Sequence, residues 1–307
     1  MTTSGPAPDP VAADSFVSEI TFDEPSHTYT LRGHTAPISV TGLISKHFEA
    51  FDGPAVVERY FGKWKENADS KYYALIHQHQ NDDDAKRAIL DGWEANKKEA
   101  CLLGTAMHKL IEERLIDTSW QQHHDLWEDC NLWGLEGEID AWEAWLDGRQ
   151  NGDGWKWVAS ELIVGGLDAD GKLCLGGSVD ALFKNRDGEF VLVDWKRTKE
   201  PFGPDEGTRF SKSGTGPAKA LVDTKYNKYA LQLAVYAELL RTTMGIDVGD
   251  RRFLVRLSKG DGAEQIDAWH PEFDTVAKAL LHEAGVVPAP PIRKAKKPRT
   301  DEGPPRE

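Results

Sequence analysis

The chain has 307 residues, 39% of them hydrophobic and 29% charged, and its formal net charge is −14. This composition is typical of a globular protein with a buried core, and it excludes a collagenous or largely disordered chain. No segment approaches the roughly 18 consecutive apolar residues of a membrane-spanning helix, and the first residues lack the basic and apolar regions of a signal peptide. We therefore expect an intracellular, cytoplasmic protein without a membrane partner.

The first half of the chain predicts a hairpin followed by helices. Residues 1–18 are rich in Pro, Ala, Ser and Asp and predict a disordered arm. Polar and apolar residues then alternate around Gly33, which predicts a hairpin, and Thr41 is the expected N-cap of the first helix. Residues 41–150 form the predicted helical part, and apolar residues recur at helical intervals up to residue 115. Five tryptophans are expected to fill a core between helices: Trp120, Trp127, Trp133, Trp142 and Trp145.

From Trp155 the pattern changes to the alternation typical of strands. Three such runs, separated by the turn sequences LDADGK and NRDG, predict a meander of antiparallel strands. A glycine-rich, partly basic loop follows, then a helix that ends at Gly245, two strands and a closing helix. This order predicts an α+β fold with a central mixed β-sheet flanked by helices and an N-terminal helical region. The expected segments are strands 155–166, 172–185 and 189–198, loop 200–219, helix 224–245, strands 251–258 and 263–269, helix 273–285 and a disordered basic tail over 286–307.

Basic residues gather in two places although the chain is acidic overall. Residues 196–228 hold eight basic and four acidic residues, and the tail from residue 286 onward holds six basic and three acidic ones. A basic strip that lines a working cleft allows an acidic protein to bind nucleic acid. For the tail, three interpretations stay open: a nuclear localisation signal if the source is eukaryotic, a phosphate tether, or a solvated tail without function.

Asp180, Asp194 and Lys196 form the most informative pattern. Asp180 is expected to end the second strand of the meander, and Asp194 and Lys196 lie two residues apart near the end of the third, so that both project from one face. The hairpin can bring Asp180 alongside them. Two carboxylates about 4 Å apart repel by roughly 4 kcal/mol at an effective dielectric constant near 20. A divalent cation removes this repulsion, and Mg²⁺ or Mn²⁺ suits a site of few carboxylates that also binds phosphate oxygens.

Five further residues lie on elements that can reach this site. Glu161 is predicted within an apolar strand, where a carboxylate is costly unless it is paired or near a metal. His108 lies on a helix that is expected to pack on the sheet, with Glu112 one turn further, and its neutral imidazole is a potential metal ligand. Gln232 and Tyr236 share a helix face that can offer an amide and a phenol to a nucleotide.

Each of these residues also has a purely structural interpretation. A single D-x-K on a strand is most often an exposed pair, a single histidine is most often a satisfied core residue, and Glu161 alone could pair with an arginine. Gln232 and Tyr236 alone suit an amphipathic helix. The ordered set favours catalysis, because so many coincidences in one order on compatible elements are improbable.

This order resembles the PD-(D/E)XK nuclease superfamily, in its RecB-like exonuclease branch. The branch pattern is G-x-x-x-H-x-x-x-E on a helix, a strand Glu, G-x-x-D, an apolar run that ends in D-x-K, and Q-x-x-x-Y on a helix. Residues 37–44, PISVTGLI, are also similar to the P-S-V-T segment of mitochondrial genome maintenance exonucleases and their phage relatives. The matching residues are Gly104, His108, Glu112, Glu161, Gly177, Asp180, Asp194, Lys196, Gln232 and Tyr236.

The resemblance implies a nuclease domain over residues 19–285 with a catalytic core over 104–257. Lys196 would position or activate the attacking water and stabilise charge on the phosphorus, and Glu161 would be an outer or second-metal carboxylate. The implied metal ligands are His108, Asp180, Asp194 and the backbone carbonyl of Trp195. The implied substrate contacts are the loop 201–218, Gln232, Tyr236, Lys219, Lys225, Lys228 and Arg197.

The sequence thus predicts a deoxyribonuclease that depends on Mg²⁺ or Mn²⁺. An exonuclease on single strands or free ends is favoured, because no separate recognition domain is evident. A catalytically inactive module that binds nucleic acid or a protein, or a structure-specific endonuclease, are the alternatives. Cys101, Cys130 and Cys174 lack C-x-x-C spacing, so we expect neither a disulfide framework nor an iron–sulfur cluster.

Overall fold

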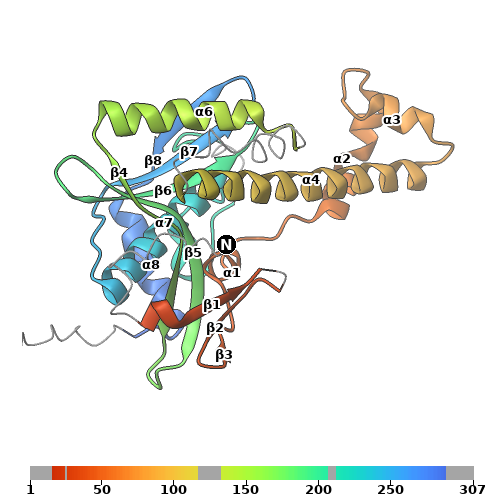
Figure 1. The fold of residues 1–307 in the computed structure, drawn as a ribbon. Coiled ribbons are helices and arrows are strands. Elements are labelled where there is room, and N and C mark those ends of the chain that lie inside the picture. Colours follow the sequence, from red (N-terminus) through yellow and green to blue (C-terminus); the bar gives the residue numbers. More distant parts are fainter. Residues whose placement is uncertain (1–15, 25, 117–132, 207–211, 288–307) are drawn as a thin grey trace, which may run out of the picture.

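The computed structural model describes residues 16–24, 26–116, 133–206 and 212–287. Figure 1 shows a sheet between helices, and a long helix that carries two shorter helices away from the sheet. In this described part of the chain, no helix is both long and apolar enough to cross a membrane. The predicted core residues Trp120 and Trp127, and Cys130, lie outside the described residues.

A small antiparallel sheet begins the described chain and confirms the predicted hairpin. Gly33 adopts a left-handed backbone with φ +80° between the second and third strands, as a tight turn requires. Val17 is buried in the preceding 3₁₀ helix, so the predicted boundary of the disordered arm at residue 18 was placed too late. The elements are η1 (Phe16–Glu19), β1 (Ile20–Asp23), β2 (Thr28–Leu31) and β3 (His34–Thr35), in sheet order β1-β2-β3.

The first helix, α1 (Val40–Ser45), begins earlier than predicted. Ser39 is its N-cap, since its backbone is extended and its hydroxyl accepts a hydrogen bond from the Gly42 N–H at 3.1 Å. The prediction of Thr41 as the cap was wrong, because Thr41 already lies inside the helix. α1 packs against the later helix α7 (Lys225–Leu239) and the strand β5 (Leu173–Lys184), and it therefore covers part of one face of the main sheet.

Three helices confirm the predicted helical region, and together they form an arm. These are α2 (Gly53–Glu66), α3 (Tyr73–Gln78) and α4 (Asp82–Ile116). At about 1.5 Å per residue, α4 extends roughly 50 Å. Its first turns share a small core with α2 and α3, whereas its last turns pack on the sheet. We use "the arm" for α2, α3 and residues 82–93 of α4. The core of the arm consists of Val57, Phe61, Ile76, Ala85 and Ile89.

A five-stranded mixed sheet carries the rest of the fold, as predicted. Its order is β4-β5-β6-β7-β8, with β6 and β7 parallel and the other pairs antiparallel. The parallel pair needs a long crossover, and this contains the predicted loop and the helix α7. The strands are β4 (Lys156–Leu167), β5 (Leu173–Lys184), β6 (Phe190–Arg197), β7 (Arg252–Ser258) and β8 (Gly262–Asp267).

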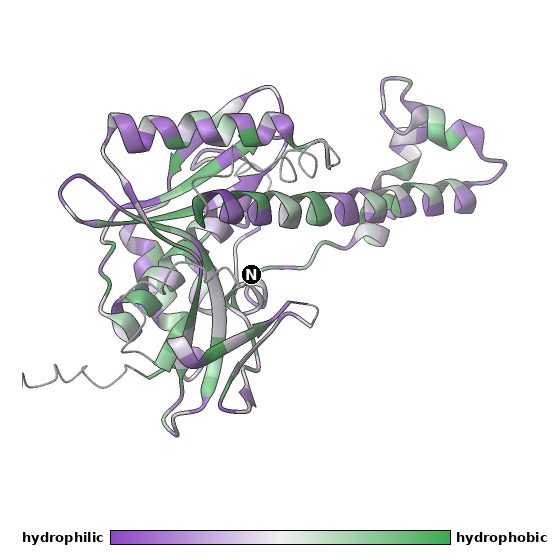
Figure 2. Ribbon diagram, viewed as in Figure 1, coloured by the Kyte–Doolittle hydropathy of each residue, from purple (hydrophilic) through white to green (hydrophobic). Residues whose placement is uncertain are grey.

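Helices cover both faces of this sheet. One apolar cluster joins the sheet to α1, α7 and α8, and a second joins it to α4 and α6. Figure 2 shows α4 and α6 as alternating hydrophilic and hydrophobic turns, as expected for helices with one buried face. The helices are α6 (Glu136–Asp147), continued by the π-helical turn η3 (Gly148–Gly152), η5 (Gly216–Ala220), α7 (Lys225–Leu239), continued by the π-helical turn η6 (Leu240–Met244), and α8 (Pro271–Glu283).

Two of the predicted core tryptophans lie between α6 and the sheet. Trp142 and Trp145 are buried and meet Trp195 of β6 edge-on, with ring centroids 6.3 Å and 5.3 Å from that of Trp195. Trp133 does not follow the prediction, because 41% of its surface is exposed. The two buried rings thus fix α6 over the strand that carries Asp194 and Lys196.

The C-terminal end of the fold extends slightly beyond the prediction. Gly245 ends η6 in the left-handed conformation, as expected for a helix C-cap. The Val287 N–H donates a hydrogen bond to the Leu167 carbonyl at 2.9 Å, and Val286 packs against Gly166. Residues 286 and 287, expected in the tail, therefore belong to the fold.

Candidate active site

Three carboxylates lie in one row across neighbouring strands. The antiparallel register of β4 and β5 places Glu161 opposite Asp180, between the pairs Ser160–Ala181 and Leu162–Val179. The register of β5 and β6, continued one residue beyond the pair Ala181–Val193, places Asp180 opposite Asp194. Opposite residues of antiparallel strands share a face, and strands are about 4.8 Å apart. Three negative side chains therefore meet on one face of the sheet.

Asp180 is buried in the middle of β5, which continues to Lys184, so the expectation that Asp180 ends its strand was wrong. One oxygen, Oδ2, accepts a hydrogen bond from the Trp195 backbone N–H at 2.8 Å. This bond joins β5 to β6 at the level of the row. The position inside the sheet removes Asp180 from water, and a carboxylate without water needs positive partners.

Glu161 has an unusual backbone. Its φ is +45°, in the left-handed region, which costs a non-glycine residue roughly 1 kcal/mol or more. Its Oε2 accepts a hydrogen bond from the Ser178 hydroxyl at 2.7 Å, and its Oε1 lies 3.8 Å from Nδ1 of His108. The strained residue is therefore held with its carboxylate toward the row of acids and the histidine.

His108 reaches the row from α4. Its Nε2–H donates a hydrogen bond to the Trp195 carbonyl at 3.0 Å, because a carbonyl can only accept. Its Nδ1 lies 3.5 Å from Oδ2 of Asp180. The Trp195 carbonyl, predicted as a metal ligand, is thus the group that fixes the tautomer of His108. Nδ1 is left to face the carboxylates, where it can hold either a proton or a cation.

The protonation of these groups follows from their crowding. Burial and then the charge of Asp194 raise the pKa of Asp180 to about 7. Burial alone would lower the pKa of His108, but Asp180 and Glu161 raise it to about 9. Burial would raise the pKa of Glu161, but the facing His108 and the Ser178 hydrogen bond lower it. Without a metal the cluster therefore keeps protons to balance its negative charge.

Lys196 lies beside Asp194 on the same face of β6, as the D-x-K spacing predicts. Its Nζ is 2.6 Å from Oδ2 of Asp194, and it lies 4.8 Å from the ring centroid of Tyr229 on α7. Burial would lower the pKa of Lys196, but Asp194 and Asp180 raise it, so the side chain is an ammonium at neutral pH. A protonated Lys196 can donate hydrogen bonds and stabilise negative charge, but it cannot accept a proton.

The donor set fits a hard divalent cation. His108, Glu161 and Asp180 can each offer a ligand atom such that the three atoms lie within 4.8 Å of one another. Asp194 is 1% exposed, and its Oδ1 has no hydrogen-bond partner among the described residues. Carboxylate oxygens with one imidazole suit Mg²⁺ or Mn²⁺. Glu161 thus joins the potential ligands, whereas Asp194, a predicted ligand, lies outside this set of three and contacts Lys196.

A groove of about 770 Å³ leads to the cluster. It runs between α4 and the β1–β2 hairpin, and His108 and Glu161 lie on its wall. Glu112, one turn beyond His108, also lines it, and burial and then Glu161 raise the pKa of Glu112. The further lining residues include Gly104, Lys109, Ser178 and His27.

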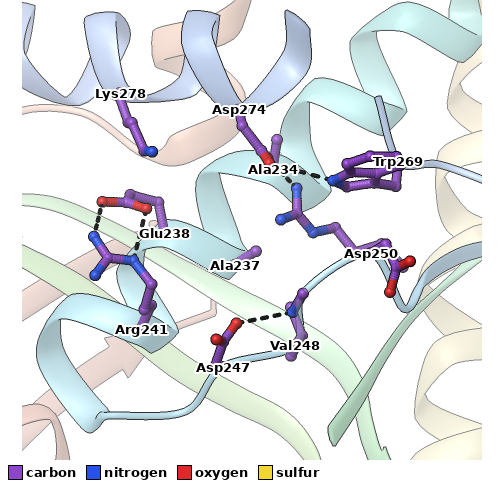
Figure 3. A pocket seen from close by; sticks show the side chains of 12 residues that line it. Ala234, Ala237, Glu238, Arg241, Asp247, Val248, Asp250, Trp269, Asp274 and Lys278 are labelled. Atoms are coloured by element: carbon purple, nitrogen blue, oxygen red, sulfur yellow. Dashed lines mark hydrogen bonds and ion pairs between the residues drawn. The ribbon is translucent and has the colours of Figure 1, made fainter. Parts of the chain in front are cut away.

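A second pocket, of about 400 Å³, lies away from these residues, between α7, α8 and the start of β7 (Figure 3). Its charged groups are mostly paired with one another, as Glu238 is with Arg241 and Asp274 with Arg252. None of the site residues predicted from the sequence lines it.

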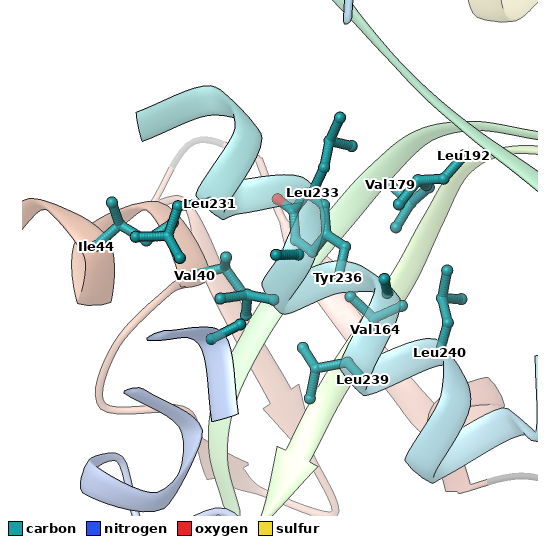
Figure 4. Packing of buried hydrophobic residues seen from close by; sticks show 14 of the residues in the cluster. Val40, Ile44, Val164, Val179, Leu192, Leu231, Leu233, Tyr236, Leu239 and Leu240 are labelled. Carbon is teal, nitrogen blue, oxygen red and sulfur yellow. The ribbon is translucent and has the colours of Figure 1, made fainter. Parts of the chain in front are cut away.

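Gln232 and Tyr236 form a pair on α7, but the ring of Tyr236 is buried. The Gln232 Nε2–H donates a hydrogen bond to the Tyr236 hydroxyl at 3.0 Å, and Figure 4 shows the ring among apolar side chains such as Val164. A Cβ atom on Gly177 would come within 2.7 Å of this ring. Tyr236 therefore packs on the strand that carries Asp180, and its ring does not face the solvent as a nucleotide contact requires.

Arg197 lies on the opposite side of the sheet from Lys196, so the prediction that it contacts the substrate is wrong. Strand alternation turns it toward α6, where its Nε is 3.0 Å from the buried carboxylate of Glu138. The three predicted lysines lie around the start of α7. Lys228 is 2.6 Å from Asp223 and Lys225 is 3.8 Å from Glu200, while Lys219 is exposed on η5.

Two residues of the site escaped the sequence analysis. Ser178 precedes Asp180 by two residues, so strand alternation could have placed it on the same face. Tyr229 precedes Gln232 by three residues on α7, which is close to one helical turn. Neither residue type has a charge or a metal preference that would single it out in a sequence.

A family model described as the PD-(D/E)XK nuclease superfamily matches residues 74–300, well over half of the chain. No curated protein matches the chain. Among solved structures, the one titled "Crystal structure of SSO0001" is similar at 15% sequence identity, with 58% of this chain and 69% of that chain covered and a TM-score of 0.27. A TM-score this low supports no conclusion, so the family assignment depends on the sequence match.

Proposed function

The chain belongs to the PD-(D/E)XK nuclease superfamily, and from this membership and the geometry of the site we propose that it is a metal-dependent deoxyribonuclease. The main support for the proposal is the convergence of three acidic residues, a histidine and a lysine beside a groove that His108 and Glu161 line. The set is Glu161, Asp180, Asp194, His108 and Lys196. The order of motifs favours the RecB-like exonuclease branch. Mg²⁺ is the proposed ion, and Mn²⁺ is its expected substitute.

The metal would be held by Asp180, Glu161 and Nδ1 of His108, with Asp194 at its side. When bound, it supplies Lewis-acid stabilisation of charge on the phosphate and lowers the pKa of a bound water. The Nε2–H of His108 remains hydrogen-bonded to the Trp195 carbonyl. Loss of the proton on Nδ1 therefore leaves Nδ1 free to bind the ion. Ser178 holds Glu161, and the Trp195 N–H holds Asp180, in place.

Lys196 is proposed to bind a non-bridging oxygen of the scissile phosphate. As an ammonium it donates hydrogen bonds to the charge that grows on the phosphoryl oxygens as water attacks, and such preorganised donors contribute several kcal/mol. Asp194 holds Nζ in position at 2.6 Å, and the ring of Tyr229 lies beside it. The raised pKa of Lys196 makes it a positioning and charge-stabilising group, not the base that takes the proton of water.

The main alternative is an inactive module that binds nucleic acid or protein. The buried, crowded carboxylates argue against this alternative. Removal of such charges is often neutral or stabilising, so a protein that only binds a partner would be more stable without them. An endonuclease would use the same chemistry, and the lengths of the cleavage products distinguish an endonuclease from an exonuclease.

The test is the Mg²⁺-dependent cleavage of single-stranded and duplex oligonucleotides labelled at either end. We expect the unaltered chain to release short products progressively from one end of a single strand, and Lys196→Ala to slow cleavage by about 10²-fold or more. Lys184→Ala, on the same sheet but away from the row, is the matched control and should leave the rate unchanged. No cleavage by the unaltered chain with either Mg²⁺ or Mn²⁺ would contradict the proposal.

A further inference from the structure

Five aromatic rings, from the arm and from residues next to α2 and α3, form a continuous row. The ring of Phe51 lies 5.5 Å from that of Trp93, Trp93 lies 6.2 Å from Trp64, and Trp64 lies 6.0 Å from Tyr60, measured between ring centroids. Tyr72 adjoins the middle of the row, 4.5 Å from Trp64, and its hydroxyl accepts a hydrogen bond from Trp93 Nε1 at 2.8 Å. We call Phe51, Trp93, Tyr72, Trp64 and Tyr60 the aromatic row.

The two ends of this row are exposed without a structural reason. Phe51 is 74% exposed and Tyr60 is 42% exposed, and neither packs on the core of the arm. Trp64, Tyr72 and Trp93 do pack on that core, and they are only partly buried. Large apolar side chains that contact one another but remain open to water indicate a surface for a partner.

Cations without a carboxylate partner accompany the rings. Lys65, Lys86 and Arg87 have carboxylate partners. Among the described residues there is none for Arg59 or Lys63, which directly precede Tyr60 and Trp64 in the sequence of α2. The Nζ of Lys71 lies 5.0 Å from the centroid of Tyr72. Stacking rings interspersed with free cations are the combination that binds single-stranded nucleic acid, since every base has a π-face and every nucleotide a phosphate.

The same face of α4 leads from the row to the proposed active site. Each helix residue turns by about 100°, so residues 11 apart in sequence differ by only about 20° around the helix. Trp93 and Gly104 are such a pair, and so are Lys97 and His108. Gly104 and His108 line the groove that contains the cluster. Trp93 and His108 are about 22 Å apart along the axis of α4.

Between these ends, α4 is open to solvent. All residues from 94 to 102 are exposed, so this stretch lies bare on every side. Lys97, on the face shared with Trp93 and His108, has no carboxylate partner among the described residues, whereas the neighbouring Lys98 is paired with Glu94 at 3.9 Å. The aromatic row, Lys97 and the groove residues Gly104 and His108 therefore follow one another along one side of α4. Figure 1 shows α4 running from the arm to the sheet.

We propose that the aromatic row is a stacking surface for the single-stranded part of the DNA substrate, which then follows α4 past Lys97 to the catalytic cluster. This inference rests on the proposed nuclease function and adds the location of the strand and a substrate class, because bases in an intact duplex are not free to stack on rings. It also predicts that a strand must span about 22 Å to reach from the row to the cluster.

The rings are tested by DNA binding, measured by fluorescence anisotropy in a Lys196→Ala background that keeps the DNA intact. With a labelled twenty-nucleotide oligothymidylate, Phe51→Ala and Tyr60→Ala should each weaken binding about tenfold or more. A blunt duplex should bind the variants as it binds the parent. Phe51→Trp and Tyr60→Phe should restore the affinity for the long strand. Trp269→Ala is the matched control, because its ring is 41% exposed but lies at the second pocket.

Lys97 and Lys98 provide a second, independent comparison. Lys97→Glu should weaken binding of the long strand several-fold and reduce the salt dependence, whereas Lys98→Glu should do neither. Ultraviolet crosslinking of an oligonucleotide that contains 5-iodouracil, followed by peptide mapping on the chain with its rings intact, should identify residues of the aromatic row. Crosslinks confined to other surfaces would overturn the proposal even if the ring variants failed to fold.

The outcomes separate this inference from the proposed function. Hydrolysis of bis(p-nitrophenyl) phosphate with Mn²⁺ reports on the cluster alone and should be unaffected by the control variant Trp269→Ala. Suppose that this activity and DNA cleavage are present. The stacking surface is then refuted, and the nuclease stands, if the ring variants bind the long strand like the parent or if they lose affinity for the duplex as much as for the long strand. If no hydrolysis occurs but the rings still control binding, the nuclease is refuted and the stacking surface stands.

Discussion

Asp180 carries the least favourable charge among the site residues. It lies between Glu161 and Asp194 in the row, it is buried, and its pKa is raised to about 7, so its ionised form is disfavoured in the folded protein. A group with such a pKa is retained at the expense of stability, which is common at functional sites. The charge is useful only when a cation is bound.

We therefore expect Asp180→Asn to stabilise the metal-free protein at pH 8. Each unit of raised pKa corresponds to about 1.4 kcal/mol of free energy. The variant also loses the attraction between Asp180 and His108, so its free energy of unfolding should rise by on the order of 1–3 kcal/mol. Urea unfolding in EDTA measures it. Asp187→Asn, in the exposed turn between β5 and β6, is the control and should change the free energy of unfolding by less than about 0.5 kcal/mol. A destabilised Asp180→Asn would show that the native charge is already compensated.

The pH dependence of the metal response follows from the same pKa values. The raised pKa of Asp180, about 7, means that the folded state holds a proton that the unfolded state loses near pH 4, so metal-free stability falls between about pH 4 and 7. His108, raised to about 9, contributes stability that is complete below pH 6.5 and is lost as the pH rises through 9. A metal replaces these protons.

The rise in melting temperature on addition of Mg²⁺ should therefore increase from pH 6 to pH 9, and thermal shift assays with and without EDTA across this range measure it. The increase should be smaller in Asp180→Asn. A metal response that is constant with pH, or largest at pH 6, would contradict the assignment of Asp180 and His108 as ligands.

Residue types and spacing predicted part of this site. Strand alternation correctly placed Lys196 beside Asp194, because a two-residue period needs no knowledge of partners. The same rule applied to Arg197 would have predicted that it projects from the opposite face, where it lies beside Glu138. Burial of Tyr236 could not be predicted, because helical spacing gives the face of a residue but not what packs on that face.

At the level of elements, β5 depends on Gly177, where two helices approach the strand closely. An added Cβ at Gly177 would lie 2.7 Å from Cε1 of Tyr236 and 3.1 Å from Cγ2 of Val40, both on helices that cover the sheet. Such a Cβ would push α7 and α1 away from the strand that carries Asp180. The other glycine of the motif, Gly104 on α4, has no atom within 4 Å of an added Cβ.

Gly177→Ala should thus lower the free energy of unfolding by about 1–3 kcal/mol through overpacking. Gly104→Ala, the comparison in the same sequence motif, should raise it by up to about 1 kcal/mol, since alanine is favoured over glycine inside a helix. Chemical denaturation of the two variants measures both effects. Equal effects would mean that the close packing of α7 on β5 is not the reason for Gly177.

The elements themselves were largely predictable from periodicity. The change from a helical to a two-residue period near Trp155, with turn sequences between the runs, gave the three strands of the meander. The left-handed backbone of Glu161 left no signal, because no glycine or asparagine marks it. The sequence also did not show that α4 is a single helix of 35 residues, because a local pattern does not tell whether one helix runs from one hydrophobic core into the next.

For the whole molecule, the distribution of charge matters more than its total. The net charge is −14, yet the proposed DNA path follows Arg59, Lys63 and Lys97, which lack a carboxylate partner among the described residues. The basic tail carries six basic and three acidic residues from residue 286 onward. Because residues 286 and 287 pack on the end of β4, the tail begins at this edge of the sheet.

Truncation after Val287 tests whether the tail is a phosphate tether. If it is, single-strand affinity at low salt should fall, and the slope of log K against log salt should become shallower by about 0.7 for each phosphate that the tail neutralises in the full chain. Anisotropy titrations from about 50 to 200 mM salt measure the slope. Hydrolysis of bis(p-nitrophenyl) phosphate is the control for the intact fold. An unchanged slope would exclude the tether.

The central claim is that the row of carboxylates with His108 and Lys196 captures a divalent ion for phosphodiester hydrolysis. It is tested most directly by the rate of Mg²⁺-dependent cleavage of a labelled single strand by the unaltered chain and by Asp180→Asn. The account predicts cleavage by the former and a rate at least about 10³-fold lower for the variant, although the variant is at least as stable. Equal rates, or no cleavage by either protein, would contradict it.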